Sequence, residues 1–436
     1  MKRFHLKTLR LLTAAAVLGL TAGLASPALA QRDQPIEPID LPPSVEQGVD
    51  MIYIDPEIAP RLNDQNVAMH QISFEEWAGA PLDLFLPVNP IYTDLRRGLV
   101  RYRQRWGDLP QVQLPAGPVM KLGSEGMNVA VLRERLGLAP GSKFDQPLAN
   151  VVKEYQAAHG IKADGVAGGG TVASLNLGSQ HYERLIIVNL ERARRLPLAT
   201  ERGRYVLVDV GAAKMFMYDN GRVVDSMKVI VGKEETATPM MAAQMRYASV
   251  NPYWNVPPEL VISLIAPNVL KQGFQYLRDR RYEVLADWSD EAAAIDPATV
   301  DWEAVKAGQK VIRVRQLPGG GNSMGSVKYM MPNDFGIYLH DTPNKAVFAD
   351  DNRWISNGCI RLEDSNRFAA WLMGGLPAAA DPDRPQRVDL QAPVPVYITY
   401  LTAAATPQGV TFRPDPYRRD AAVIARYFGE ERVASR

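Results

Sequence analysis

The stretch FGIYLHDTPNKAVFADDNRWISNGCIR, residues 335–361, holds the only cysteine of the chain, Cys359, and one of its five histidines, His340. Apolar residues alternate with others over 335–340, which predicts a strand with Tyr338 and His340 on one face. A turn-rich excursion follows, and the chain returns to Cys359. After Glu363 the apolar spacing becomes helical and ends at Gly374-Gly375. This stretch therefore predicts a strand, a long loop, the thiol and then a helix that begins close behind it.

The same residue types suit thiol chemistry. A thiol nucleophile needs a base and a positive neighbour, and His340 and Arg361 can supply them. Gly358 would let a substrate approach the backbone, and the amides of Gly358 and Cys359 could hold an oxyanion. A helix start behind the thiol would add its dipole. Two plainer interpretations stay open, a cysteine that only packs in the core and a histidine with no chemical role.

His340, fifteen residues and then Ser-x-Gly-Cys-x-Arg together resemble the signature of the L,D-transpeptidases, which carry a YkuD-type catalytic domain. The resemblance implies that Cys359 is the acyl-enzyme nucleophile and His340 the proton acceptor and donor. Many members of the family have a histidine where this chain has Asn357. As candidate substrate contacts we take Arg361, Tyr338, Asn357, Ser356 and Trp254.

Residues 1–30 have the pattern of a signal peptide, with a basic start, an apolar run and Ala28-Leu29-Ala30 before the expected cleavage point. An uncleaved membrane anchor is the alternative. Without this segment, which has four basic and no acidic residues, the balance of 49 basic and 48 acidic residues becomes net −3. No basic stripe points to nucleic acid. We expect export to the periplasm, with membrane contact only through an uncleaved segment.

One cysteine excludes a disulfide within the chain, and the scattered histidines show no metal-ligand spacing. We therefore expect neither a metal nor a cofactor.

The rest of the chain divides by composition. We predict a Pro-rich, acidic linker at 31–65, a helical scaffold at 66–118 and 177–200, and a small three-helix module at 119–176. Arg192, Arg194 and Arg195 are expected to face water. The module resembles the peptidoglycan-binding type 1 domain through LGSEGMNVAVLRERL and YQAAHGIKADGVAGGGT. It could bind glycan or serve only as a scaffold.

Residues 201–430 are predicted to form the catalytic domain, with a hairpin turn at Asp219-Asn220-Gly221 and a helical insertion at about 259–310. Thr238-Pro239 and NPYWNVPP, residues 251–258, resemble elements of the YkuD domain in its YcbB-like group. In that group a capping subdomain lies over the active site, whereas a solvated surface excursion is the alternative. The expected fold class is α+β, a mostly β catalytic domain preceded by the three-helix module and the scaffold helices.

The resemblance implies a transferase of cell-wall synthesis and cell shape that takes peptidoglycan tetrapeptide stems as donor and acceptor. It would release terminal D-Ala, form 3→3 crosslinks and be acylated by carbapenems, and other wall-synthesis enzymes are candidate partners. Two alternatives stay open: hydrolysis of the same acyl-enzyme, and an inactive wall-binding scaffold with Asn357 as the mark of lost activity. No Ser-x-x-Lys occurs in the sequence, which disfavours a serine penicillin-binding enzyme.

Overall fold

The structure is a computed structural model that describes residues 51–54, 88–289 and 291–429. The predicted signal peptide, the first part of the predicted scaffold up to residue 87 and most of the predicted linker lie outside these residues. Within that linker, β1 (Met51–Ile54) pairs with β5 (Met241–Val250).

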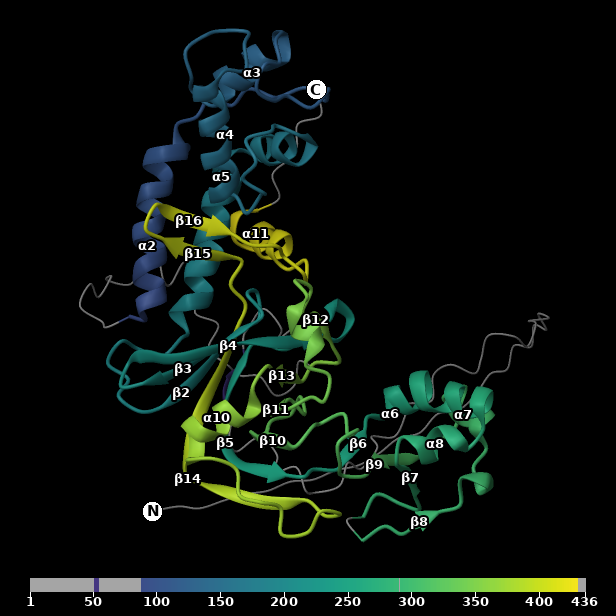
Figure 1. Cartoon of the computed structure of the whole chain (residues 1–436). Helices are drawn as coiled ribbons and strands as arrows, with labels where there is room; N and C mark the ends of the chain where they lie inside the picture. The colour runs from purple at the N-terminus through teal and green to yellow at the C-terminus, as the bar shows by residue number, and fades with distance from the viewer. Residues whose placement is uncertain (1–50, 55–87, 290, 430–436) are drawn as a thin grey trace, which may run out of the picture. The chain divides into compact units, whose positions relative to one another are not determined.

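Eight strands of the catalytic domain pair in a closed circuit (Figure 1). The order is β5-β10-β11-β13-β4-β3-β2-β14, and β14 pairs again with β5. Two of these strands, β11 (Leu339–His340) and β13 (Ile360–Leu362), flank the loops of the stretch around the thiol, and β10 (Val327–Met330) precedes it. The others are β2 (Tyr205–Asp209), β3 (Lys214–Asp219), β4 (Arg222–Gly232), β5 (Met241–Val250) and β14 (Gln386–Thr399). β12 (Trp354–Ser356) adds to β4.

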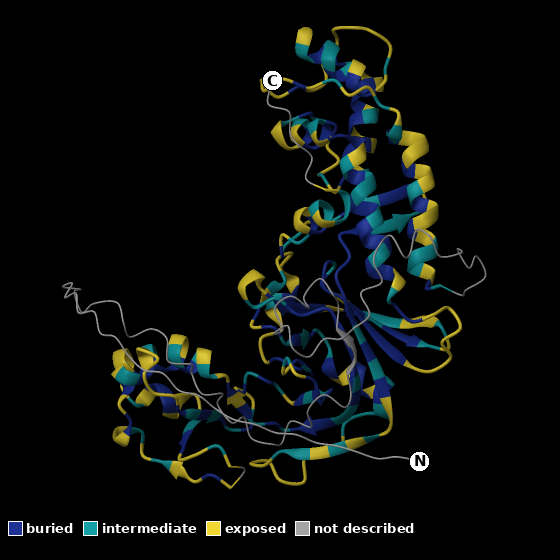
Figure 2. Cartoon of the chain, turned by 180° about the vertical axis from the view of Figure 1, so that it is seen from behind, coloured by how far each residue is buried: buried dark blue, intermediate teal, exposed yellow. Residues whose placement is uncertain are grey.

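The strands alternate between an apolar core and an outer face. Val327, Tyr329, Leu339, Ile360 and Leu362 all point into one buried cluster. Figure 2 shows the same division, with buried residues along the strands and exposed residues on loops and outer helix faces. Because side chains alternate along a strand, the neighbours of these core residues lie on the opposite face of the sheet. His340 is one of those neighbours.

The hairpin between β3 and β4 forms as the sequence predicts. Asp219 pairs with Arg222, while Asn220 and Gly221 have φ of 52° and 74°. Two successive positive φ values are typical of the type I′ turn, which Asn-Gly favours.

The strand predicted over 335–340 is wrong over its first four residues, since only Leu339 and His340 pair as β11. Gly336 has φ 62°, and the Asn333 side chain accepts from the amides of Phe335 and Ile337. A turn around the Asn333 side chain therefore uses the backbone amides that a longer strand would need for pairing.

The helix predicted after Glu363 is present as α10 (Ser365–Met373), capped by Asp364 and ended by Gly374 in the left-handed conformation. It does not begin behind the thiol, however. β13 lies between Cys359 and the helix, so the predicted dipole effect on the thiol is wrong.

The insertion between β6 (Trp254–Val256) and β9 (Arg313–Gln316) contains the predicted helices and also a sheet that the sequence did not predict. The sheet order is β6-β9-β7-β8. Its strands are too short to show an alternating pattern. Its other elements are α6 (Pro258–Leu260), α7 (Ala266–Gln272), α8 (Gln275–Asp279), β7 (Tyr282–Leu285), β8 (Ala294–Ile295) and α9 (Trp302–Lys306). The insertion has its own apolar core, and Tyr338 packs against it.

The helices before the catalytic domain are α2 (Pro90–Tyr102), α3 (Met127–Arg135), α4 (Gln146–Ala158) and α5 (Gly169–Arg194). α5 joins the predicted third helix of the module to the predicted linker helix through a break at Gly178, φ 84°. α2 runs beside α5 and against a hairpin of β15 (Ala403–Thr406) and β16 (Gly409–Phe412) (Figure 1). A Cβ at Gly98 would lie 2.6 Å from Val410 Cγ2, which shows how closely α2 approaches that hairpin.

Arg192 was expected to face water, and this expectation is wrong. Its side chain is fully buried and forms an ion pair of 2.7 Å with Asp420 of α11 (Asp420–Phe428). A residue 228 positions away supplies the counter-charge, which no local pattern could reveal.

Among the described residues, none of the helices combines the length and apolar character that crossing a membrane requires.

Candidate active site

Cys359 lies in a tight loop between β12 and β13. Gly358 has φ 114°, and a Cβ there would lie 3.3 Å from Ile337 Cδ1, so a glycine suits this position. The Ser356 hydroxyl donates to the Cys359 carbonyl oxygen at 2.7 Å and accepts from the Gly358 amide at 3.2 Å. Ser356 therefore closes the loop internally, while Asn357 at its tip is exposed.

Two threonines hold this loop from outside. Thr236 donates to the Ser356 carbonyl oxygen at 3.0 Å, and Thr238 donates to the Gly358 carbonyl oxygen at 2.7 Å. Thr238 is fully buried and its hydroxyl also accepts from the Gly232 amide at 2.9 Å. The loop is thus tied to the end of β4 by side-chain hydroxyls.

Tyr417 extends these bonds toward the C-terminal part of the chain. Its hydroxyl accepts from the Thr238 amide at 3.2 Å and donates to the Gly232 carbonyl oxygen at 2.7 Å. The ring stacks on Tyr400 with centroids 5.1 Å apart. Residues far apart in the sequence therefore fix the position of the Gly358 peptide.

His340 is 2% exposed, and its Nδ1 lies 2.5 Å from the Asp341 carbonyl oxygen. Because a carbonyl can only accept, we assign the ring proton to Nδ1, which leaves the Nε2 lone pair free to accept a proton. Burial and then the nearby Arg361 guanidinium lower the pKa of His340 to about 3, against the raising effect of the Asp341 carbonyl. The imidazole is therefore neutral at rest.

Four candidate side chains, those of Tyr338, His340, Cys359 and Arg361, gather where β11 and β13 begin. His340 pairs with Arg361 across the parallel strands β11 and β13. Tyr338 and Cys359 directly precede these two strands, and the Ile360 amide donates to the Tyr338 carbonyl oxygen at 3.1 Å. The Tyr338 amide and hydroxyl lie beside the thiol, so Cys359 is held at the start of the strand that pairs with that of His340.

The Cys359 thiol is half-buried and donates to the Gly336 carbonyl oxygen, with Sγ···O of 3.7 Å. Burial raises the pKa of this thiol, while the Tyr338 amide and hydroxyl, Lys328 and Arg361 lower it without offsetting the burial. Thiol and imidazole are both neutral, and the described hydrogen bonds include none between them. Such contacts are often long before a substrate binds.

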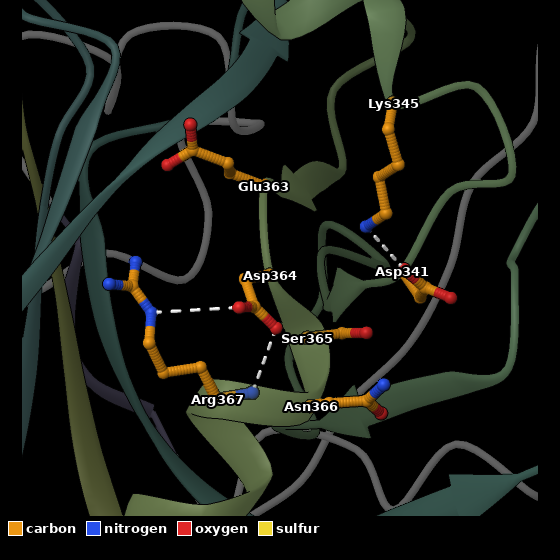
Figure 3. A pocket seen from close by; sticks show the side chains of 7 residues that line it. All are labelled: Asp341, Lys345, Glu363, Asp364, Ser365, Asn366 and Arg367. Atoms are coloured by element: carbon orange, nitrogen blue, oxygen red, sulfur yellow. Dashed lines mark hydrogen bonds and ion pairs between the residues drawn. The ribbon is translucent and has the colours of Figure 1, made fainter.

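Asp341 supports the histidine. Its carboxylate accepts from the Ser326 amide at 2.9 Å and from Lys345 Nζ at 2.6 Å. Burial raises the pKa of Asp341, but these donors outweigh it and hold the pKa below its ordinary value. Figure 3 shows Lys345 aimed at Asp341 in a polar pocket that α10 also lines. Neither Cys359 nor His340 lines this pocket, so we regard it as support behind the site.

The structure brings together seven of the eight predicted site residues: Cys359, His340, Gly358, Arg361, Tyr338, Asn357 and Ser356. Trp254 is 9% exposed and lies in the core of the insertion, against which Tyr338 also packs. Its contact with substrate stays a prediction.

Sequence reasoning missed Lys328, Asp341 and the bonds of Thr238. Lys328 pairs with His340 across β10 and β11. The alternation over 327–330 could have placed Lys328 on an outer face, but not beside the histidine. Across the described residues, no group of three or more histidine, cysteine or acidic side chains is arranged to hold a metal ion.

Comparison with known proteins gives two family matches. Residues 203–398 match the YkuD family, described as the L,D-transpeptidase catalytic domain, and residues 134–175 match a family described as "Putative peptidoglycan binding domain". A Haemophilus influenzae protein described as "Putative L,D-transpeptidase" is 31% identical over 235 residues. That match covers 52% of this chain and 47% of the relative, so the chain spans about half of the relative's length.

Solved structures give weaker overlaps. An L,D-transpeptidase from Mycobacterium smegmatis is 13% identical, with 45% of this chain and 58% of that chain covered and a TM-score of 0.22. One from Xylanimonas cellulosilytica is 15% identical, with 65% and 98% covered and a TM-score of 0.21.

Proposed function

Since residues 203–398 form an L,D-transpeptidase catalytic domain of the YkuD type, we propose that this protein is a peptidoglycan L,D-transpeptidase that works through a cysteine acyl-enzyme. The observation that carries the proposal is that Tyr338, His340, Cys359 and Arg361 gather where the paired strands β11 and β13 begin. It supplies a thiol, a base with a free lone pair and a permanent positive charge within one domain.

In the first half of the reaction, His340 Nε2 accepts the thiol proton as Cys359 Sγ attacks the carbonyl that follows the L-centre of the diamino acid. The carbonyl oxygen becomes an oxyanion. The carbon–nitrogen bond then breaks, the protonated His340 gives its proton to the leaving amine, and D-Ala departs. A thioester remains on Cys359.

In the second half, the side-chain amine of another stem attacks the thioester and gives a proton to His340. The carbon–sulfur bond breaks, and the sulfur takes the proton back. The product is a 3→3 crosslink. Because His340 is neutral with its proton on Nδ1, it can act as the acceptor in both halves.

The Cys359 amide is the better placed oxyanion donor. Gly358 C=O and Cys359 N–H belong to one trans peptide, in which they point in opposite directions. Thr238 holds that carbonyl oxygen at 2.7 Å, so the amide points away from Thr238. The Gly358 amide, which we also expected to contribute, donates to Ser356 in the resting loop. Tyr338 is a second donor beside the sulfur.

We place this activity in the periplasm, after export through residues 1–30, and residues 134–175 would hold the enzyme on the wall. The insertion, whose core contacts Tyr338, suits a cap over the bound stem. Carbapenems, as acyl donors, would acylate Cys359.

The test is intact-mass spectrometry of the mature protein with a carbapenem, beside Cys359→Ala. We expect a mass increase of one drug molecule that the variant lacks. A folded protein that forms no adduct, where a known family member does, would favour the wall-binding scaffold. Incubation with disaccharide tetrapeptide then separates crosslinked dimer from hydrolysed tripeptide.

A further inference from the structure

The candidate base stands between two cations. In the register of three adjacent strands, Lys328 of β10 pairs with His340 of β11, and His340 pairs with Arg361 of β13. Residues that stand directly opposite each other in a sheet share a face, with side chains about 5 Å apart. Lys328, His340 and Arg361 therefore form one row on the face that carries Cys359.

Neither cation has an acidic partner among the residues that the structure describes. Arg361 Nε is buried without a hydrogen-bond acceptor. Lys328 Nζ lies 5.7 Å from the centre of the Tyr338 ring, and burial lowers the pKa of this lysine, while a thiolate at Cys359 would raise it. Asp341, which follows His340 in the chain, is already paired with Lys345 at 2.6 Å.

Such an arrangement is unfavourable in a protein on its own. Partly buried charges are normally paired, because removal from water without a counter-charge is costly. Both cations also disfavour the protonated form of His340, which the reaction requires. An anionic group that enters with the substrate would remove both difficulties.

We infer that Lys328 and Arg361 form a binding site for the α-carboxylate of the amino acid that leaves the donor stem. The inference rests on the function proposed above. His340 must give a proton to the leaving amine, and in an amino acid the carboxylate is bonded to the same carbon as that amine. Cations on both sides of His340 therefore stand where that carboxylate arrives.

Two consequences follow for the reaction. The enzyme selects donor stems that end in a free carboxylate at the residue to be released. The carboxylate also offsets the two positive charges beside His340, so the base gains proton affinity only when a donor is bound. By microscopic reversibility, an acceptor amine that has a carboxylate on the same carbon binds with that carboxylate between the same two cations.

The experiment compares two donors that differ at one group, a tetrapeptide stem with a free C-terminal carboxylate and the same stem with a C-terminal carboxamide. Release of the terminal residue is followed by mass spectrometry in wild type, Lys328→Met and Lys328→Arg. In wild type we expect kcat/KM to favour the free acid by roughly 10- to 100-fold, the range of a charge-assisted hydrogen bond. Lys328→Met should lose most of that preference, and Lys328→Arg should keep most of it.

The ratio of the two donors is the decisive quantity, because a merely structural effect of the substitution lowers both rates alike. A wild-type enzyme that releases the terminal residue equally well from acid and amide overturns the inference without reference to any variant. So does a Lys328→Met enzyme with an unchanged ratio. Failure of the proposed function looks different, since Cys359 would then form no adduct with a carbapenem.

Discussion

A substitution of Thr238 tests whether its hydrogen bonds fix the orientation of the peptide between Gly358 and Cys359. Thr238 is fully buried, and its hydroxyl donates to the Gly358 carbonyl oxygen and accepts from the Gly232 amide. Thr238→Val keeps the shape and removes both bonds. The bonds fix the peptide that carries the Cys359 amide, so the substitution should disturb the oxyanion site without touching the thiol.

The magnitude follows from the two groups left behind. A buried donor or acceptor without a partner costs about 1–3 kcal/mol. With both affected, Thr238→Val should lower the free energy of unfolding by about 2–6 kcal/mol. Loss of a whole oxyanion donor slows a reaction about 100- to 1,000-fold, so a misdirected one should slow acylation by roughly 10- to 100-fold.

Two reactions of the same thiol distinguish a misdirected oxyanion donor from a change in the reactivity of the thiol itself. Acylation by a carbapenem passes through a tetrahedral oxyanion, whereas alkylation by iodoacetamide does not. We expect Thr238→Val to lower the acylation rate far more than the alkylation rate, as followed by intact mass. Thr238→Ser, which keeps the hydroxyl, is the matched control and should hold the ratio near that of wild type.

The reasoning fails if Thr238→Val acylates and alkylates in the wild-type ratio. It also fails if urea unfolding shows no loss of stability, because two buried groups would then have found other partners.

Three further predictions concern other parts of the chain. Arg192→Met leaves Asp420 buried without its partner and should lower the free energy of unfolding by about 3–5 kcal/mol in urea, with partial recovery in the double variant Arg192→Met/Asp420→Leu. His159 is buried, and this burial lowers its pKa to about 4, below the ordinary 6.5. Above pH 6.5 His159 is neutral in both the folded and the unfolded protein. As the pH falls from 6.5 toward 4, the unfolded protein binds a proton that the folded protein does not, so the free energy of unfolding should fall by up to about 3 kcal/mol. His159→Gln should flatten that part of the plot of stability against pH. At Gly325, φ is 63° and a Cβ would lie 2.3 Å from Asp341 Oδ2, so Gly325→Ala should shift the carboxylate behind His340 and slow acylation in a mass assay; an unchanged rate would contradict this support role.

What the sequence predicts well here is local. The Asn220-Gly221 turn depends only on two residues that accept positive φ, and α10 shows its cap, apolar face and glycine stop within a dozen positions. The pair of Cys359 and His340 could be proposed because the residue types are rare in this chain and suit one chemistry.

What the sequence does not predict depends on register and on distant partners. Lys328 reaches His340 only because β10 and β11 pair with these two residues opposite each other. Arg192 looks like a solvated arginine until α11 brings Asp420 to it. The β11 strand is shorter than its apolar alternation suggests, because the Asn333 side chain competes for the same amides. In each case the interaction that decides the structure depends on the fold, and no local pattern in the sequence predicts it.

Before a substrate binds, the charges and burial of the site disfavour the proposed reaction. A thiol is most nucleophilic as the thiolate, yet burial raises the pKa of Cys359, and burial with Arg361 lowers the pKa of His340 to about 3. Proton transfer from sulfur to imidazole is therefore unfavourable before a substrate binds. A thiol that stays protonated is also less exposed to oxidation, which suits a chain with one cysteine. If Lys328 and Arg361 bind the donor carboxylate, the substrate itself offsets the positive charge beside His340. His340 then gains proton affinity only when a donor is bound. The same two cations would then provide both selectivity for the donor and activation of His340.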